Sequence, residues 1–214
     1  MDEIDLKAQE AIEELRNRIQ KLDQDSLDLM FLQARTFYGW QDIPVSDEQL
    51  RLLYDILKMG PTSGNCFPIR IRFLRSKQAK ERLLPHVFEG NRPKVMSAPV
   101  VLIIAHDHEF YEQIPKLMPH NPKRKEFVLS KPQLLESTAF RNGSLQGAYF
   151  IMAARAMGLD TGPMSGFNNA GVDKEFFEGT NIKSNFISNL GYGEVSSVFK
   201  RLPRLDFDEV CEIL

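Results

Sequence analysis

A long stretch, residues 136–157, carries apolar side chains on almost every face of a predicted helix, so the rest of the fold has to be built around it. The apolar positions are Ala139, Phe140, Leu145, Ala148, Tyr149, Ile151, Met152, Ala153, Ala154 and Ala156. A helix on the surface of a globular protein shows one apolar stripe, whereas a helix that is apolar all round is covered by other elements. We therefore expect this helix to be central and covered on all sides, and Gly158 to end it.

Three other stretches have the pattern of β-strands. Residues 69–74 alternate apolar side chains with arginines, which indicates a strand with one buried face. Residues 99–105 belong to the apolar run A-P-V-V-L-I-I-A, which has the length of a buried strand and is too short to span a membrane. Residues 186–190 (F-I-S-N-L) predict a third strand, which G-Y-G closes. The chain therefore mixes strands with helices.

Helical periodicity marks further segments. Apolar residues recur every three or four positions over residues 4–22, in a narrow stripe that suits docking on another surface or on a partner chain. We interpret residues 1–24 as an N-terminal helical extension. Another helix opens at the capping box Ser46-x-x-Gln49 and ends at Gly60. Residues 115–135 are rich in proline and basic residues, show weak periodicity, and predict a loop or lid.

Composition excludes several classes of protein. A formal net charge of -2 over 214 residues argues against a protein that binds nucleic acid or a membrane surface. No linker, internal repeat or low-complexity tract interrupts the chain, so we expect one domain over residues 1–214. The N-terminus is acidic and lacks the features of a signal peptide. Cys66 and Cys211 lie far apart in the sequence, and these features together favour a reducing cytoplasm.

The sequence contains no self-contained catalytic centre. Residues 191–193 (G-Y-G) lack the third glycine of a dinucleotide fingerprint, residues 162–166 (G-P-M-S-G) miss the spacing of a hydrolase elbow, and no phosphate-binding loop is present. His106 and His108 follow a predicted strand, but without further ligands a polar strand end is favoured over a metal site. If the protein is an enzyme, we expect a bound organic cofactor to carry the chemistry.

A polar turn and three cations could together hold an anionic cofactor. Residues 61–65 (P-T-S-G-N) follow a helix stop and supply hydroxyls, an amide and backbone N–H groups. Arg35, Lys94 and Arg201 are the cations, and a charge-assisted hydrogen bond to a phosphate is worth roughly 1.5–3 kcal/mol. Taken separately, the turn suits an ordinary loop and each cation suits a solvent-exposed surface.

From about Asp25 onward, the sequence resembles the flavin-dependent nitroreductase family over nearly its whole length. The resemblance is carried by the order and spacing of A-R-T at 34–36, G-P-T-S-G-N-C-F-P at 60–68, G-N-R-P-K at 90–94, A-P-V-V-L-I-I-A at 98–105, G-L-D-T-G-P-M-S-G-F at 158–167, N-L-G-Y-G at 189–193 and R-L-P at 201–203. Within the family, residues 138–149 and 162–173 are similar to the malonic semialdehyde reductases, also called 3-hydroxypropanoate dehydrogenases.

This resemblance implies an α+β nitroreductase-like fold, in which a central, mostly antiparallel sheet is flanked by helices. It also implies an intertwined homodimer with FMN at the subunit interface. By position, one chain would contact FMN through Arg35, Thr36, Phe37, Asn91, Lys94, Ser165, Gly166 and Arg201. The partner chain would reach the flavin with Pro61, Thr62, Ser63 and Asn65. Among these, Arg35 and Arg201 match the phosphate end of FMN.

The implied activity is a ping-pong hydride transfer through flavin N5, from NADH or NADPH to an acceptor, with no side chain acting as a nucleophile. The similarity to the reductase branch implies that malonic semialdehyde is reduced to 3-hydroxypropanoate. A cation should then face the substrate carboxylate, and the candidates are Arg141 and the basic run 123–125. Arg141 suits a structural hydrogen-bonding role equally well. Phe67 is a further candidate on the substrate side.

Three positions depart from the family pattern. Gly39 stands where many members have a second basic residue, Ser165 stands where a glutamate is usual, and Phe67 stands where a polar residue is frequent. These departures affect the polarity around the flavin ring and the range of substrates. They leave two alternatives open: a broad-specificity nitroaromatic or quinone reductase with the same cofactor, and a flavin-binding protein without turnover.

Overall fold

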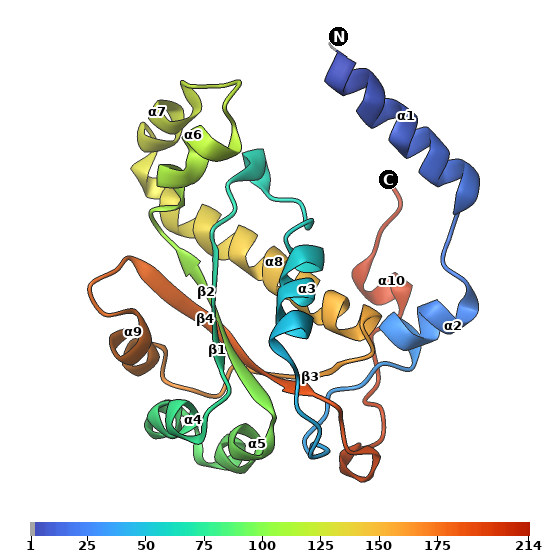
Figure 1. Ribbon diagram of the computed structural model, residues 1–214, viewed down its shortest axis with the longest axis vertical. Helices are drawn as coiled ribbons and strands as arrows, with labels where there is room; N and C mark the ends of the chain where they lie inside the picture. Colours follow the sequence, from blue (N-terminus) through green and yellow to red (C-terminus); the bar gives the residue numbers. More distant parts are fainter. Residues whose placement is uncertain (1–2) are drawn as a thin grey trace.

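The computed structural model describes residues 3–214, and within that range four strands form one sheet (Figure 1). The strands are β1 (Ile69–Leu74), β2 (Val100–Asp107), β3 (Asp160–Met164) and β4 (Ile182–Gly191), in the order β1-β2-β4-β3. Each neighbouring pair is antiparallel. The predicted α+β fold with a central antiparallel sheet is therefore confirmed, and β1 and β3 are the edge strands.

Both faces of the sheet are covered by helices, and β2 lies in the middle of the fold (Figure 1). The helices on one face are α3 (Asp47–Leu57) and α8 (Leu135–Ala156); those on the other are α4 (Lys77–Leu83), α5 (Arg92–Ser97) and α9 (Asn169–Phe177). Leu102 and Ile104 of β2 pack with α3 and α8, whereas Val101 and Ile103 pack with the other three helices. Because alternate side chains of a strand point to opposite faces, a strand buried on both sides is apolar throughout.

Local signals in the sequence explain where several helices begin and end. Ser46 Oγ accepts a hydrogen bond from the Gln49 backbone N–H at 3.2 Å, and Gln49 Oε1 accepts one from the Ser46 N–H at 2.9 Å, so the predicted capping box opens α3. Gly158 follows α8 with a φ of 71°, a left-handed conformation that glycine adopts without a steric penalty.

The central helix is present where it was predicted, but it is not covered on all sides. One face of α8 packs against the sheet and α3, with Ala139, Phe150 and Ala154 buried. The opposite face exposes Phe140, Leu145 and Tyr149, which are 53%, 47% and 42% accessible. The prediction of a fully covered helix is therefore wrong for a single chain, because neighbouring elements of the same chain reach only one of its apolar faces.

The structure corrects one further prediction and adds one strand. Residues 115–135 are not one loop, because they include most of α6 (Ile114–Leu117), all of α7 (Arg124–Leu129) and a 3-10 turn over Pro132–Leu134. Helices this short contain too few turns to show periodicity. Strand β3 was not predicted, because Gly162 and Pro163 disfavour strands; a proline is tolerated there because β3 is an edge strand.

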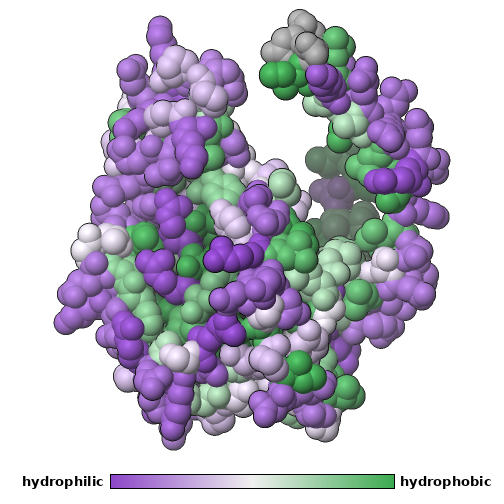
Figure 2. Space-filling model, viewed as in Figure 1, coloured by the Kyte–Doolittle hydropathy of each residue, from purple (hydrophilic) through white to green (hydrophobic). Residues whose placement is uncertain are grey.

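Both ends of the chain form arms with exposed apolar side chains. The N-terminal arm consists of α1 (Glu3–Arg18), α2 (Gln24–Leu27) and a π-helical turn over Asp28–Leu32. Figures 1 and 2 show α1 projecting from the body, with green apolar patches among its purple charged residues. The C-terminal arm, residues 199–214, includes the short α10 (Phe207–Val210) and is exposed throughout. None of the helices in residues 3–214 is long and apolar enough to cross a membrane.

Candidate functional site

A cavity of about 650 Å³ lies where the segment after α2 meets the C-terminal arm, and we call it the Arg35 cavity. Its basic side chains come from three separate parts of the chain: Arg35, Arg155, Lys200, Arg201 and Arg204. Among the described residues, the lining includes no aspartate or glutamate. Because like charges gathered in one hollow create a strong positive potential, this lining suits a bound anion.

Backbone carbonyls, rather than carboxylates, hold the two predicted phosphate-binding arginines. Arg35 donates a hydrogen bond to the carbonyl of Phe199, and Arg201 donates one to the carbonyl of Leu32 at 2.6 Å. The N-terminal and C-terminal arms therefore hold each other through these arginines. Neither arginine forms an ion pair with a carboxylate within residues 3–214, so both positive charges remain uncompensated.

The floor of the Arg35 cavity comes from the C-terminal turn of α8. Arg155 Nη1 donates to the carbonyl of Met30 at 2.9 Å, and burial lowers the pKa of Arg155. Burial also raises the pKa of nearby Asp160, which accepts a hydrogen bond from the Gly193 N–H at 2.8 Å. Arg155 and Asp160 are both partly buried, so water is partly excluded around them, which strengthens the attraction between Arg155 and an anion.

A second polar group, around Lys94, adjoins the Arg35 cavity. Lys94 Nζ donates to Asn91 Oδ1 at 3.0 Å and lies 4.7 Å from the centre of the Tyr38 ring, a cation–π contact. Asn91 Nδ2 donates to the carbonyl of Gly166 at 3.4 Å. Tyr38 also lines the Arg35 cavity, so the two groups are neighbours. The structure thus brings together six of the predicted residues: Arg35, Thr36, Asn91, Lys94, Gly166 and Arg201.

Thr36 and Phe37 connect this region to the sheet. Thr36 lines the Arg35 cavity and forms a bridge to Thr161 of β3, and the Phe37 N–H donates to the Thr161 carbonyl at 3.2 Å. The Phe37 ring packs on Gly193, where an added Cβ would lie 2.1 Å from a ring carbon. Phe37 therefore anchors the segment and does not line the cavity, which explains why a glycine is needed at 193.

The polar turn at 61–65 lies at the opposite end of α8. The Ser63 N–H donates to Asn142 Oδ1 at 2.8 Å, and Asn65 Nδ2 donates to the carbonyl of Leu117 at 3.1 Å. Asn142 and Arg155 lie 13 positions apart on α8, which is about 20 Å along the helix axis. Within one chain, Pro61, Thr62, Ser63 and Asn65 are therefore not brought to the Arg35 cavity. That these residues contact the flavin of a partner chain stays a prediction.

The other predicted residues lie in three different places. Ser165 is exposed beside Gly166, where an added Cβ would lie 2.6 Å from Asn91 Nδ2. Arg141 is exposed on α8. Phe67 lines a groove of about 870 Å³ along β1 and has a positive φ of 46°. Neither Arg141 nor Phe67 lines the Arg35 cavity.

The two predicted histidines lie together, on the side of α8 near its N-terminus. His106 is inside β2 and His108 follows it, with 5.2 Å between the ring centres, and burial lowers the pKa of His106 to about 4. His106 Nδ1 and His108 Nε2 are buried without a hydrogen-bond partner among the described residues. In residues 3–214, no group of three or more His, Cys, Asp or Glu side chains could hold a metal ion.

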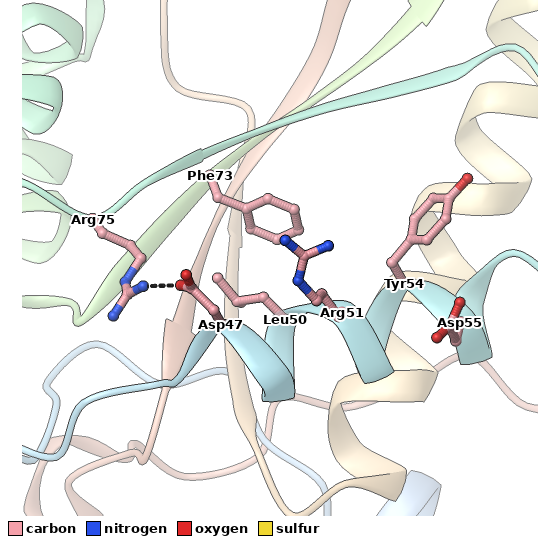
Figure 3. Close-up of a pocket in the computed structure, with 7 residues that line it drawn as sticks. All are labelled: Asp47, Leu50, Arg51, Tyr54, Asp55, Phe73 and Arg75. Atoms are coloured by element: carbon pink, nitrogen blue, oxygen red, sulfur yellow. Dashed lines mark hydrogen bonds and ion pairs between the residues drawn. The ribbon is translucent and has the colours of Figure 1, made fainter.

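A further hollow, of about 570 Å³, lies between α3 and the edge strand β1 (Figure 3). Its charged rim carries both signs: Asp47, Arg51 and Asp55 lie on α3, Arg75 directly follows β1, and Asp47 pairs with Arg75. Figure 3 shows Phe73 of β1 standing over the exposed face of α3. Because its charges balance, this hollow lacks the excess positive charge that distinguishes the Arg35 cavity.

Several side chains of the site were not predicted. They are Tyr38, Arg155 and Lys200. Arg155 had a signal that could have been used, because it is a lone arginine near the end of a largely apolar helix. Tyr38 had none, since only the fold brings its ring within reach of Lys94.

Comparisons with known proteins agree with this fold. The model of the nitroreductase family matches residues 32–191. Three solved structures match with TM-scores of 0.79, 0.80 and 0.78 and with 20%, 17% and 17% sequence identity. They are assigned as a nitroreductase from Bacillus subtilis, a nitroreductase in complex with FMN from Exiguobacterium sibiricum, and an NAD(P)H:FMN oxidoreductase from Staphylococcus epidermidis. The matches cover 90%, 91% and 91% of this chain and 100%, 99% and 98% of theirs.

Proposed function

The chain belongs to the nitroreductase family, and on this basis we propose that it is an FMN-dependent NAD(P)H oxidoreductase. One observation carries the proposal: the Arg35 cavity gathers five basic side chains from three parts of the chain without a neutralising carboxylate in its described lining. Arg35 and Arg155 are partly buried and the other three cations are exposed, so water weakens their mutual repulsion, and the cluster attracts anions without a carboxylate in the lining to compete. The phosphate of FMN is an anion of the right charge, and Arg35 and Arg201 are its proposed ligands.

The residues around Lys94 fit the polar edge of a flavin ring. Lys94 and Asn91 supply N–H donors next to the Arg35 cavity, and Gly166 keeps space open where any side chain would displace Asn91. When bound, FMN supplies the hydride chemistry, accepting from NADH or NADPH and delivering to an acceptor. In this arrangement Lys94 stabilises negative charge on the ring, and the two arginines retain the cofactor.

A homodimer is part of the proposal. The exposed apolar face of α8 and the two exposed arms leave large apolar side chains in water, which is unusual for a stable monomer. A second copy of this chain would cover them. It would also bring a 61–65 turn to the Arg35 and Lys94 region, which one chain cannot do because the two lie about 20 Å apart along α8.

The proposed acceptor is malonic semialdehyde, a small aldehyde acid, in a cytoplasmic enzyme. The similarity of residues 138–149 and 162–173 to malonic semialdehyde reductases supports this acceptor. A broad nitroaromatic or quinone reductase would share the cofactor site and differ only in the acceptor. Comparing kcat/KM for malonic semialdehyde with that for a nitroaromatic separates the two.

The first experiment is the visible absorption spectrum of the purified protein, before and after anaerobic NADH or NADPH. We expect a yellow protein whose flavin absorption is bleached by at least one of the two donors. A colourless protein that cannot be reconstituted with FMN would contradict the cofactor assignment. A yellow protein that neither donor bleaches would instead support a flavin-binding protein without turnover.

A further inference from the structure

A second, smaller cavity of about 190 Å³ lies at the N-terminal end of α8, behind the turn at 62–67, and we call it the Arg124 cavity. Phe110, Ile114 and Leu135 contribute apolar walls, and Arg124 and Lys131 contribute positive charge. None of its described lining residues is acidic. The volume equals the space of roughly six water molecules, well below the roughly 300–1,000 Å³ of sites for drug-sized ligands. It therefore suits an acid of only a few carbon atoms.

The two cations of this cavity share one aromatic ring. Arg124 Cζ lies 5.1 Å and Lys131 Nζ lies 4.5 Å from the centre of the Phe127 ring. Two positive charges held this close repel one another. A carboxylate bound between them would attract both and offset that repulsion. Arg124 Nε is buried and has no hydrogen-bond partner among the described residues. A buried donor without an acceptor is costly, so a small shift of the Arg124 side chain toward an anion in the cavity would gain a hydrogen bond in addition to the attraction between charges.

The structure also distinguishes Arg124 from the other basic residues proposed to face a substrate. Lys125 Nζ points elsewhere and pairs with Glu112 Oε2 at 2.6 Å. Lys123 and Arg141 are exposed and do not line the Arg124 cavity. Of these candidates, Arg124 alone combines a place in a cavity with an unused donor.

Arg124 is also joined to the turn that the proposed function directs to the partner's flavin. A Cβ on Gly64 would lie 2.9 Å from Arg124 Nη2, so the guanidinium packs directly against this glycine. Gly64 has a φ of 55°. Its neighbours are held by hydrogen bonds, from the Ser63 N–H to Asn142 Oδ1 of α8 and from Asn65 Nδ2 to the Leu117 carbonyl. The cation therefore has a fixed position relative to the turn.

We infer that Arg124, assisted by Lys131, binds the carboxylate of the acceptor, and that the enzyme selects small aldehyde acids over neutral aldehydes for this reason. The inference rests on the proposed function, because it assumes that the acceptor enters beside the 61–65 turn. The apolar walls contact the short carbon chain, and the guanidinium fork pairs with the carboxylate oxygens. Arg124 is thus a substrate-binding residue that sets specificity.

The test is a calorimetric titration of the flavin-loaded protein with 3-hydroxypropanoate and with its neutral analogue 3-hydroxypropanamide. We expect the wild type to bind the acid more tightly than the amide. Arg124→Gln should weaken acid binding by roughly 10- to 100-fold and leave amide binding unchanged. Arg124→Lys should bind the acid with an affinity between those of the wild type and Arg124→Gln, because lysine keeps the positive charge and lacks the planar guanidinium group. Lys125→Gln is the matched control from the same basic run, and it should bind both ligands as the wild type does.

Kinetics give a second readout. Arg124→Gln should raise KM for malonic semialdehyde, whereas Lys125→Gln should leave it unchanged. Equal binding of acid and amide by the wild type, or unchanged acid binding in Arg124→Gln, would overturn the inference. If Arg124→Gln does not fold, Arg124→Lys and Lys131→Gln carry the same test. Failure of the proposed function would be recognised separately, since the wild type would then lack a bleachable flavin whatever its acid affinity.

Discussion

The two ends of α8 each have a cavity lined by cations and by no carboxylate among the described residues, but the two cavities hold their cations differently. At the C-terminal end, the arginines of the Arg35 cavity donate to backbone carbonyls from both arms of the chain. At the N-terminal end, Arg124 and Lys131 flank one aromatic ring above a cavity less than a third as large. The larger cavity suits a retained cofactor phosphate, and the smaller one suits a passing carboxylate. Thr138 in the smaller cavity and Arg155 in the larger one lie 17 positions apart on α8, about 26 Å along the helix axis, so one site can use both cavities only if two chains contribute.

Mixed dimers give the largest effect expected from this comparison. Arg201→Ala and Arg124→Gln should each have low activity with malonic semialdehyde as a homodimer. In a dimer with one chain of each kind, one site carries both substitutions and the other carries neither. We expect activity per mixed dimer to return to about half that of the wild type. Activity no higher than the mean of the two parents would show that both cations act within one chain.

Acid should weaken the N-terminal half of α8 selectively. His106 packs against Phe140 of α8, and its folded pKa of about 4 lies below the ordinary value of 6.5. The unfolded chain therefore takes up this proton first, so stability is full above pH 6.5 and is lost as the pH falls toward 4. The loss is about 3 kcal/mol between pH 7 and pH 4. The raised pKa of Asp160, near the other end, acts with the opposite sign, because the folded state takes up that proton first.

Urea unfolding at pH 7 and pH 4 measures this difference. The free energy of unfolding of His106→Gln should change less between the two pH values than that of the wild type. An equal change in both proteins would assign the acid sensitivity to other groups.

Arg201→Ala by itself should lower the affinity for FMN by roughly 10- to 100-fold, because a charge-assisted hydrogen bond to the phosphate is lost. Equilibrium dialysis against FMN measures the change. Arg75→Ala is a suitable control, since Arg75 pairs with Asp47 in the hollow between α3 and β1, away from the Arg35 cavity. Unchanged flavin content in Arg201→Ala would remove Arg201 from the phosphate site.

Gly64→Ala should affect the other end of α8. A non-glycine residue at a φ of 55° costs about 1–2 kcal/mol, and the new methyl group would displace the Arg124 guanidinium. We expect a lower melting temperature and a higher KM for malonic semialdehyde, with FMN affinity unchanged. Gly179→Ala is matched in φ, at 74°, and has open space around it, so it should show the loss of stability without the change in KM.

Lys94→Met should give the smallest effect. Removing a positive charge near the proposed ring edge disfavours the reduced, more negative flavin, so the midpoint potential should fall by about 30 mV, equivalent to about 1.4 kcal/mol for two electrons. Spectroelectrochemical titration measures it. A potential that does not move would place Lys94 away from the ring.

How much of the site could be predicted depended on the range of the interactions. Arg35, Lys94 and Arg201 could be proposed from the sequence because their short motifs are contiguous, and the structure places Arg35 and Arg201 in one cavity with Lys94 next to it through Tyr38. Tyr38 and Arg155 were missed because their roles arise from contacts between distant segments. Strand β3 was missed because only its place at the sheet edge tolerates Pro163.

The sequence by itself determined the periodic elements: the strands at β1, β2 and β4, the capping box at Ser46 and the long helix α8, because these depend on local spacing and local hydrogen bonds. Only the tertiary structure decided which face of α8 stays exposed, and that its two ends carry separate cation clusters. It also decided that Arg124, and not Lys125, lines a cavity, because the direction of a side chain depends on contacts that no local pattern encodes.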